Sequence, residues 1–329
     1  MTTIHFHNVY VASRGTSVGL LEKQGPLGNR FDYTHEDNTC QQDSFEKAER
    51  YMLQEAVDAA IRKSDYSIKD IEVMIGGDLI NQLTSSHYFA KEFPISFLGM
   101  YAACASSSLV IGQAALWVEH QLAKTALAFT SSHVATAERQ FRFPNEYGIQ
   151  KKETTTCTVT GAGAVLLSRK KSKLKVASFT VGKVVDWQYN DANDMGVAMA
   201  PAAYDTLTTY FKDTNQSFQD FDLIVTGDLS KLGFAFLQDL LLQNGYCCEE
   251  KLQDCGLMIY DIVKQNVFCG GSGCACSMCV SMTKLLDLLE QQEARRIMVL
   301  ATGALLSPIA IQQKESIPCI AHAIVYERS

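Results

Sequence analysis

Cys104 is the residue of this sequence whose position most directly suggests chemistry. It opens the segment CASSSLVIGQAALWVEH, which has the composition of a buried helix. Unpaired backbone N–H groups at the start of a helix favour negative charge, so they lower the pKa of a thiol that lies there and supply thiolate. A nucleophilic thiolate is one interpretation of Cys104. A small buried packing residue is the other, because most cysteines in folded proteins simply pack.

The segments that would position Cys104 occur twice in the chain. Three pairs of similar segments follow one another in the same order: DIEVMIGGDL at Asp70 with DFDLIVTGDL at Asp220, the Cys104 segment with CACSMCVSMTKLLDLLEQ at Cys274, and AGAVLLSR at Ala162 with AHAIVYER at Ala321. Two long repeats of mixed helix and strand character predict two pseudo-symmetric halves rather than a solenoid. We place the halves at residues 1–170 and 171–329, and we expect one compact unit because no low-complexity linker separates them.

The composition is that of an acidic protein with a large core. The chain has 329 residues, of which 47% are hydrophobic and 20% are charged, and its net charge is −7. This charge argues against a nucleic acid as the partner, because binding of phosphates requires a basic surface. If such an acidic chain binds an anion, the groups at the binding site itself must attract it, because the overall charge does not. The eleven cysteines follow no regular framework, which fits a reducing compartment.

The sequence predicts a soluble protein without a signal peptide or a transmembrane helix. The first residues, MTTIHFHNVYVAS, lack a basic start that is followed by an apolar segment. The longest apolar stretch, Leu109 to Val118, is far too short to span a bilayer.

Strands alternate with helices in the pattern of both halves. The expected strands cover residues 9–12, 71–75, 126–129, 161–168, 176–185, 223–227, 297–300 and 320–326. The expected helices cover residues 44–63, 104–124, 201–211 and 274–291. This alternation predicts a sheet with parallel pairing and helices on its faces. The helix that starts at Cys104 is apolar on most of its faces, so it belongs inside the molecule.

A duplicated α/β half with a cysteine at the start of a buried helix resembles the thiolase and ketoacyl-synthase fold. The resemblance implies an α/β, thiolase-like fold in which two βαβαβαββ halves form a layered α-β-α-β-α core. It also implies that the acyl-accepting nucleophile of such enzymes corresponds to Cys104. Those enzymes need a His, or a His with an Asn, from the second half to polarise the thioester carbonyl and to move protons.

The second half departs from this catalytic pattern. The two places where the resemblance puts the His or Asn read Gly-Asp-Leu-Ser around Asp228 and Gly-Gly-Ser-Gly around Ser272. The second half contains a single histidine, His322, which lies inside the last expected strand. The negative charge of an Asp would oppose the charge that develops on an oxyanion, so Asp228 cannot replace a neutral imidazole. We therefore expect no acyl-transfer activity.

A narrower resemblance covers nearly the whole chain. The motifs that carry it are KQGPLGNRFD at Lys23, GDLINQ at Gly77, ATAERQFRFPNEYG at Ala135, TVTGAGAV at Thr158, DMGVAMAPAAYDT at Asp194, DLIVTGDLS at Asp222, GGSGCACS at Gly270 and ATGALLSPIAIQQKESIPCIAH at Ala301. Together they resemble the stage V sporulation protein AD family, a non-catalytic thiolase-fold family of endospore formers. The resemblance implies binding of dipicolinic acid (pyridine-2,6-dicarboxylate), alone or with calcium. It also implies that the protein works together with membrane subunits of the same operon, and that together they load this compound into the developing spore.

The residues themselves agree with a dicarboxylate ligand. Helix starts and glycine-rich turns present N–H donors that suit a carboxylate without adding basic side chains. We expect the starts of the two buried helices to meet at a cavity between the halves. The candidate ligand-binding residues there are Asp78, Cys104, Ser131, Ser132, His133, Asp228 and Ser272. The hydroxyl groups could bind carboxylate oxygens, and Asp78 could hold a ring-nitrogen proton or orient water or a calcium ion.

Each of the first-half candidates also has a purely structural interpretation. Asp78 follows a strand and could cap the segment after it. Ser131 and Ser132 could make hydrogen bonds at the end of their strand. His133 could be a histidine whose ring nitrogens are satisfied within the fold. The acidic and basic side chains between Glu138 and Arg142 could form a salt-bridged loop rather than bind a ligand.

Two further patterns are too weak to predict a site. Four cysteines, Cys269, Cys274, Cys276 and Cys279, invite a metal site. If Cys274 opens a helix, however, Cys274 and Cys276 point to different sides and no histidine joins them, so we predict no metal site or cofactor there. The turn Gly270-Gly271-Ser272-Gly273 lacks the lysine and the spacing of a phosphate-binding loop.

The resemblance also sets expectations for partners. We expect a homodimer in which Thr125–Phe129, as an edge-like strand, pairs with the same strand of a second copy. We expect a peripheral location at the spore inner membrane through protein partners. Two alternative functions stay open, namely an acyl transferase that uses Cys104 with an unusual partner such as His133, and an assembly scaffold with an empty cavity.

Overall fold

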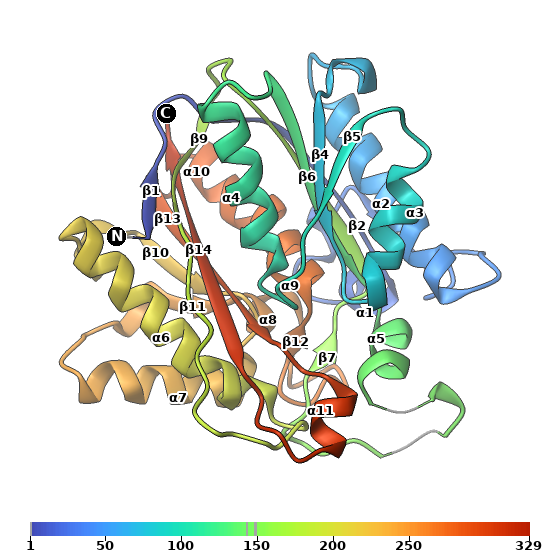
Figure 1. The fold of residues 1–329 in the computed structure, drawn as a ribbon, viewed down its shortest axis with the longest axis vertical. Coiled ribbons are helices and arrows are strands. Elements are labelled where there is room, and N and C mark those ends of the chain that lie inside the picture. Colours follow the sequence, from blue (N-terminus) through green and yellow to red (C-terminus); the bar gives the residue numbers. More distant parts are fainter. Residues whose placement is uncertain (1, 143, 148–149) are drawn as a thin grey trace.

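The computed structural model describes residues 2–142, 144–147 and 150–329 (Figure 1). Ten strands follow one another along one continuous sheet and form two sets of five. The first set has the order β5-β4-β6-β8-β2 and the second has the order β11-β10-β13-β14-β9. The strands of the first set are β2 (Tyr10–Val18), β4 (Val73–Gly77), β5 (Ser96–Gly99), β6 (Thr125–Ser132) and β8 (Gly161–Ser168). Those of the second set are β9 (Leu174–Thr180), β10 (Leu223–Thr226), β11 (Leu252–Asp254), β13 (Arg296–Ala304) and β14 (Cys319–Arg328).

The two sets repeat the same topology. In each set the three strands at the outer end pair in parallel, and the last two strands run antiparallel to their neighbours. The sets are joined where Tyr10 of β2 pairs with Lys175 of β9. The repeated strand order is the structural counterpart of the duplicated segments in the sequence. The division of the chain into 1–170 and 171–329 remains our proposal for the halves.

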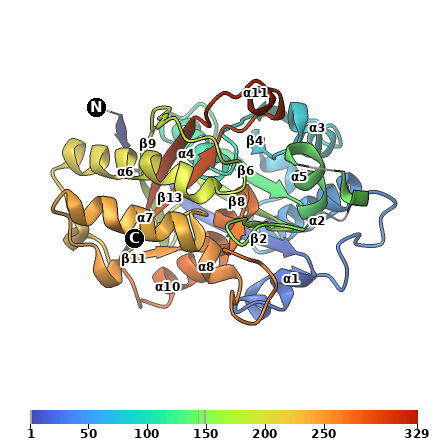
Figure 2. The same ribbon diagram turned by 90° about the horizontal axis from the view of Figure 1, so that it is seen from below.

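Helices cover both faces of these strands and also fill the space between the two sets (Figures 1 and 2). Helix α2 (Phe45–Arg62) packs on β2 and β8. Helix α6 (Met195–Thr214) packs on β13, β14 and helix α7 (Ser230–Gln243). Helices α4 (Ser106–Glu119) and α9 (Cys274–Val280) lie in the middle, where α4 contacts strands of both sets. The result is the layered α-β-α-β-α arrangement that we predicted.

Shorter elements complete the fold. The remaining strands are β1 (Thr3–His5), β3 (Tyr33–Thr34), β7 (Cys157–Thr158) and β12 (Gly271–Ser272). The remaining helices are α1 (Leu20–Lys23), α3 (Thr84–Ala90), α5 (Val134–Phe141), α8 (Cys255–Ile259), α10 (Leu286–Glu290) and α11 (Pro308–Gln312). Short 3-10 turns cover Gly28–Arg30, Ile68–Asp70, Asn81–Leu83, Asn145–Tyr147, Phe218–Asp220 and Glu249–Lys251. A π-helical turn, Ser281–Leu285, joins α9 to α10.

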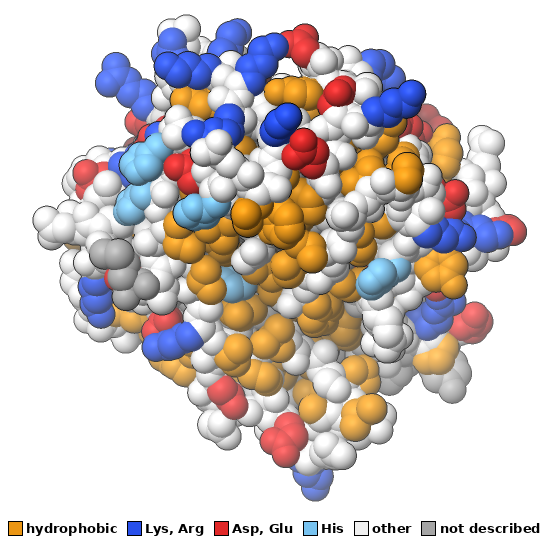
Figure 3. All heavy atoms as spheres, turned by 45° about the horizontal axis from the view of Figure 1, so that its top comes forward, with side chains coloured by type: hydrophobic (Ala, Val, Ile, Leu, Met, Phe, Trp, Pro, Cys, Tyr) orange, Lys and Arg blue, Asp and Glu red, His pale blue; other side chains and the backbone are white. Residues whose placement is uncertain are grey.

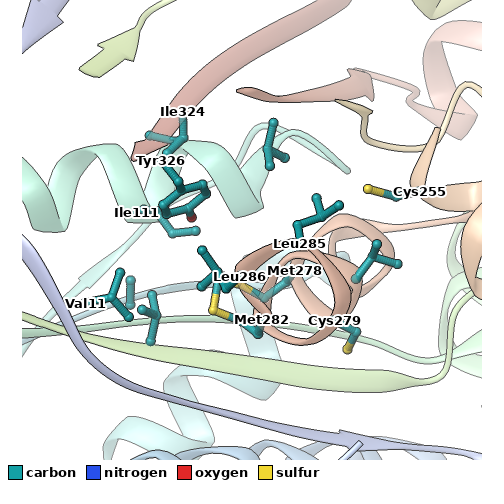
Figure 4. Packing of buried hydrophobic residues seen from close by; sticks show 14 of the residues in the cluster. Val11, Ile111, Cys255, Met278, Cys279, Met282, Leu285, Leu286, Ile324 and Tyr326 are labelled. Carbon is teal, nitrogen blue, oxygen red and sulfur yellow. The ribbon is translucent and has the colours of Figure 1, made fainter. Parts of the chain in front are cut away.

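The two central helices cross at equivalent residues. The hydroxyl groups of Ser107 in α4 and Ser277 in α9 are hydrogen-bonded at 2.6 Å. Small side chains permit this close approach, and Gly112 of α4 lies so near the ring of Phe179 that a Cβ atom there would come within 2.4 Å of it. Around the crossing, apolar side chains such as Met278 fill the core (Figure 4). The starts of both helices are therefore held next to each other between the two sets of strands.

The outer layer is fixed by similarly close contacts. Ser44 caps helix α2, because its side chain accepts a hydrogen bond from the N–H of Lys47. A Cβ atom at Gly15 of β2 would lie 2.0 Å from the carbonyl oxygen of Ala56 in α2. Only glycine therefore lets α2 pack directly on the sheet at this point.

Several predicted boundaries differ from the structure. The helix expected from Cys104 to Lys124 is α4, which begins two residues later because Ala103 adopts a left-handed conformation (φ 49°) and leaves Cys104 in the preceding turn. The helix expected from Pro201 begins at Met195, because the side chain of Asp194 caps it. The helix expected at 274–291 is confirmed, although the π-helical turn interrupts it.

The prediction of an edge strand at Thr125–Phe129 is wrong. This segment belongs to β6, which pairs with β4 on one side and with β8 on the other. Its backbone groups are therefore already used inside the sheet. The sheet ends instead at β5 in the first set and at β11 in the second.

Within the described residues, no helix combines the length and apolar character that a membrane span would require.

Candidate functional site

Residues from both halves of the fold line a narrow cavity. They come from the turn before α4, from α5 and the start of α6, and from the segments that follow β10 and β12. The lining residues are Leu79, Ala103, Cys104, Ala137, Phe141, Arg142, Thr158, Met195, Met199, Asp228, Ser272, Gly273, Ala304 and Leu306. Three of the seven predicted site residues, Cys104, Asp228 and Ser272, are thus brought together at one cavity.

Cys104 lies in a tight turn that packs against β13 of the second set of strands. The N–H of Ala102 donates to the hydroxyl of Ser106 at 2.9 Å, which closes the turn. A Cβ atom at Gly303 of β13 would lie 2.2 Å from the carbonyl oxygen of Ala102, so glycine is required for this contact. Burial raises the pKa of the Cys104 thiol well above its usual range, and the nearby Asp228 carboxylate raises it further. The thiol is therefore a weak nucleophile in this site.

Asp228 lies just after β10, and both of its carboxylate oxygens accept hydrogen bonds. Its Oδ1 accepts a hydrogen bond from the Thr302 hydroxyl at 2.7 Å, and its Oδ2 accepts one from the N–H of Gly273 at 2.9 Å. The thiol of Cys104 also acts on this carboxylate and lowers its pKa. Burial raises the pKa of Asp228 to about 6, although Cys104 and the hydrogen bonds from Thr302 and Gly273 oppose the rise. Asp228 is thus a buried acid that is largely ionised at neutral pH.

The glycine-rich turn before α9 forms the wall next to Asp228. Ser272 of β12 lies beside β7, and its carbonyl oxygen accepts a hydrogen bond from the N–H of Val159 at 2.8 Å. Gly273 has a positive φ of 100°, and a Cβ atom there would lie 2.8 Å from the hydroxyl of Ser132. This conformation aims the Gly273 N–H at Asp228 and leaves Ser272 at the cavity surface.

Asp78, which we predicted to line the ligand cavity, is not among the residues that line this one. Its carboxylate accepts hydrogen bonds from the N–H of Ile80 at 2.8 Å and from the N–H and hydroxyl of Ser86 at 2.8 and 2.7 Å. These bonds tie the end of β4 to α3. The capping role that we left open for Asp78 is the one that this geometry supports.

Ser131 also lies outside the cavity, because its hydroxyl donates to a buried carboxyl that we did not predict. The acceptor is Glu49 of α2, at 2.8 Å, which also accepts from Thr136 at 3.0 Å. Burial raises the pKa of Glu49 to about 8, and the charge of Asp78 adds to the rise. The pattern of α2 gave no signal for this contact, since Glu49 resembles any other acidic residue on a helix.

Ser132 and His133 are held by the backbone rather than by the cavity. The Ser132 hydroxyl donates to the carbonyl oxygen of Val159 at 2.7 Å. His133 donates from Nε2 to the carbonyl oxygen of Asn38 at 2.7 Å and accepts the N–H of Ala135 at Nδ1, which caps α5. Burial lowers the pKa of His133, so it stays neutral. Both residues therefore have the structural roles that we kept as alternatives, and neither lines the cavity.

The cysteines around α9 do not converge. The thiol of Cys274 donates to the carbonyl oxygen of Ser131 at 2.9 Å, whereas the thiol of Cys269 donates to that of Glu153 at 3.1 Å. In the described part of the chain, no group of three or more His, Cys, Asp or Glu side chains is arranged to hold a metal ion.

Arg142 is the lining residue whose role the sequence analysis missed. We considered the segment from Glu138 to Arg142 mainly as a salt-bridged loop, and Arg142 does contact Glu138. Helix α5 nevertheless ends at the cavity, so Phe141 and Arg142 both reach its wall. The cavity thus combines apolar side chains with one basic residue and one buried acid among the described residues that line it.

The fold and this site define a thiolase-like α/β protein. The structure resembles 3-oxoacyl-[acyl-carrier-protein] synthase III from Aquifex aeolicus VF5 with a TM-score of 0.62 and 12% identity, over 97% of this chain and 99% of that one. It also resembles cerulenin-bound OleA from Xanthomonas campestris with a TM-score of 0.61 and 14% identity, over 98% of each chain. At this level of identity the likeness establishes the fold alone.

Sequence comparison places the chain within one family of this class. The family model for stage V sporulation protein AD (SpoVAD) matches residues 1–327. The chain is 48% identical over 328 residues to stage V sporulation protein AD of Bacillus subtilis (strain 168), which covers 100% of this chain and 97% of that protein. The chain belongs to the stage V sporulation protein AD family, and its general role is therefore in sporulation.

Proposed function

We propose that this protein is a non-catalytic binding protein for dipicolinate, and that it works with membrane subunits of the same sporulation operon to load that compound into the developing spore. The observation that carries the proposal is the pairing of Cys104 with Asp228 in a cavity between the two sets of strands. At the second-half position where we expected a catalytic imidazole in thiolase-like enzymes, this chain has the acid Asp228.

The electrostatics of this pair argue against acyl transfer. A catalytic cysteine must reach the thiolate state, and the buried Asp228 carboxylate opposes that ionisation. The same negative charge would destabilise an oxyanion formed on a thioester. A test is to mix the protein with an acyl-CoA and to follow thiol release. We expect no burst, and a burst that disappears in Cys104→Ala would favour the acyl-transferase alternative instead.

The cavity suits a planar aromatic carboxylate. Apolar side chains such as Phe141, Met195 and Leu306 can contact a ring, while the hydroxyls of Ser272 and Thr158 can donate to carboxylate oxygens. Helix α4 begins beside Cys104, and the start of a helix favours an anion. These groups let an acidic protein bind a dicarboxylate without a broad basic surface.

Calorimetric titration with dipicolinate, in the presence and absence of calcium, tests the proposal. Saturable binding of one dipicolinate per chain would support it, and the two titrations would show whether the ligand is the free acid anion or its calcium complex. The absence of binding in both titrations would favour the alternative of a scaffold with an empty cavity.

We also propose that the protein is a homodimer and that it reaches the spore inner membrane through protein partners. Hydrophobic side chains gather on the face that carries α4 and β5 (Figure 3). Tyr88, Tyr101 and Leu122 are exposed, with partly buried Trp117 nearby in sequence. Strand β5 is an edge of the sheet, so its free side can pair with the same strand of a second copy.

A further inference from the structure

Glu138 of helix α5 is shared between two cations. Its Oε1 accepts a hydrogen bond from Nη1 of Arg142 at 2.5 Å and another from Nζ of Lys151 at 2.8 Å. The three side chains are only 15%, 11% and 26% exposed, respectively. This arrangement is therefore a partly buried group of two positive charges and one negative charge, not a solvated surface pair.

Arg142 belongs to this group and to the cavity wall at the same time. It is the only lysine or arginine among the described residues that line the cavity. Its Nε atom is buried and has no hydrogen-bond partner among the residues that the structure describes. A buried donor without an acceptor is unfavourable, so this N–H is a group that a bound acceptor would satisfy.

We propose that Arg142 is the residue that binds a ligand carboxylate in this cavity, and that Glu138 is an internal counterion which Lys151 retains when Arg142 engages the ligand. The inference rests on the proposed function, because it names the group that recognises the carboxylate of that ligand. An arginine can present Nε and one Nη in parallel to the two oxygens of a carboxylate.

The shared counterion explains how Arg142 can change partners. Removing one member of a buried ion pair leaves the other charge uncompensated, which is strongly unfavourable. Lys151 prevents this outcome, since Glu138 keeps one positive neighbour when Arg142 turns toward the ligand. Conversely, in the free protein Glu138 competes with the ligand for Arg142.

These contacts predict that substitutions of Arg142, Glu138 and Lys151 change the affinity for dipicolinate in different directions. Calorimetry measures this affinity. Arg142→Gln removes the charge-assisted bonds and should weaken binding by about tenfold or more. Arg142→Lys keeps the charge but not the paired donors, so its effect should be smaller. Glu138→Gln removes the competing carboxylate and should strengthen binding. Lys151→Gln should weaken binding, because Glu138 then depends on Arg142 alone.

Lys152→Gln is the matched control for Lys151→Gln. Lys152 is 61% exposed and pairs with Asp191 at 3.5 Å, so its replacement should leave the affinity unchanged. Thermal unfolding of each variant shows whether the substitution has disturbed the fold. If the parent binds dipicolinate and a folded Arg142→Gln variant binds it equally well, the inference is wrong while the proposed function stands.

A second measurement distinguishes an error in the role of Arg142 from an error in the proposed binding of dipicolinate. If the parent does not bind dipicolinate, the melting temperature of the parent and of Arg142→Gln is measured with picolinate, benzoate and phthalate. A carboxylate that stabilises the parent but not the variant would support the role of Arg142 without dipicolinate. If none of these carboxylates stabilises the parent, the inference is overturned together with the proposed function.

Discussion

The thiol of Cys104 and the buried carboxylate of Asp228 each shift the pKa of the other at the cavity wall. Burial and the Asp228 charge both raise the pKa of the Cys104 thiol, so the proton stays on the sulfur. Thr302 and the backbone of Gly273 hold the carboxylate in place from the other side. The arrangement stabilises a neutral thiol next to an ionised acid, which is the reverse of what a nucleophilic cysteine needs.

Slow alkylation of Cys104 is the first expected result. Only the thiolate reacts rapidly, and burial together with Asp228 raises the pKa of this thiol. Iodoacetamide at about pH 8 should therefore modify Cys104 much more slowly than the exposed Cys247, as measured by peptide mass spectrometry. Asp228→Asn removes the negative charge and should accelerate the reaction of Cys104. Equal rates for Cys104 and Cys247 in the parent would contradict this account.

Stability should fall as the pH rises from about 6.5 to about 8.5. Burial raises the pKa of Glu49 to about 8 and the pKa values of Glu22 and Asp254 to about 7, so the folded state holds protons that the unfolded state has released. Each such proton lowers the free energy of unfolding by up to about 1.4 kcal/mol per pH unit as it is lost. The buried His133 and His322, whose pKa values are lowered, oppose this trend only near about pH 6.5, where histidines of the unfolded state still bind protons.

Urea unfolding at the two pH values measures this dependence. Glu49→Gln keeps an acceptor for Ser131 and removes the titrating group, so its stability should change less with pH than that of the parent. A free energy of unfolding that rises from about pH 6.5 to about pH 8.5 would show that these carboxyls are not the protonated groups we describe.

Light scattering should give twice the chain mass of 36.4 kDa if the homodimer forms. A lysine on an edge strand disfavours pairing with another edge, so Ser96→Lys in β5 should shift the protein toward the monomer. Asn244→Lys adds the same charge at the end of α7, away from β5, and serves as the control. A parent that is monomeric at all concentrations rules out the dimer.

The fold could be predicted because its signal is repeated in the sequence. The two copies of a strand ending in Gly-Asp-Leu, and the buried helices led by Cys104 and Cys274, indicated two similar halves, and the strand order repeats accordingly. The position of Asp228 at the cavity could be predicted for the same reason, since it follows the second copy of the repeated strand.

The remaining site residues could not be predicted because their roles depend on contacts between distant segments. The hydroxyl of Ser131 donates to Glu49, a residue of α2 that lies 82 residues earlier in the chain. Asp78 is used locally by Ser86, and an aspartate that caps a segment has the same sequence signature as one that faces a cavity. Arg142 reaches the cavity only because α5 ends there.

The most direct test of the central claim is calorimetric titration of dipicolinate into the parent, Cys104→Ala and Cys104→Leu proteins. The small side chain of Cys104 forms part of the cavity wall, so a larger side chain at this position should fill the space that the ligand needs. We predict that Cys104→Ala binds within about threefold of the parent, whereas Cys104→Leu loses about tenfold or more in affinity while its melting temperature stays close to that of the parent. If the folded Cys104→Leu protein binds dipicolinate as tightly as the parent, the ligand does not occupy this cavity and the account is wrong.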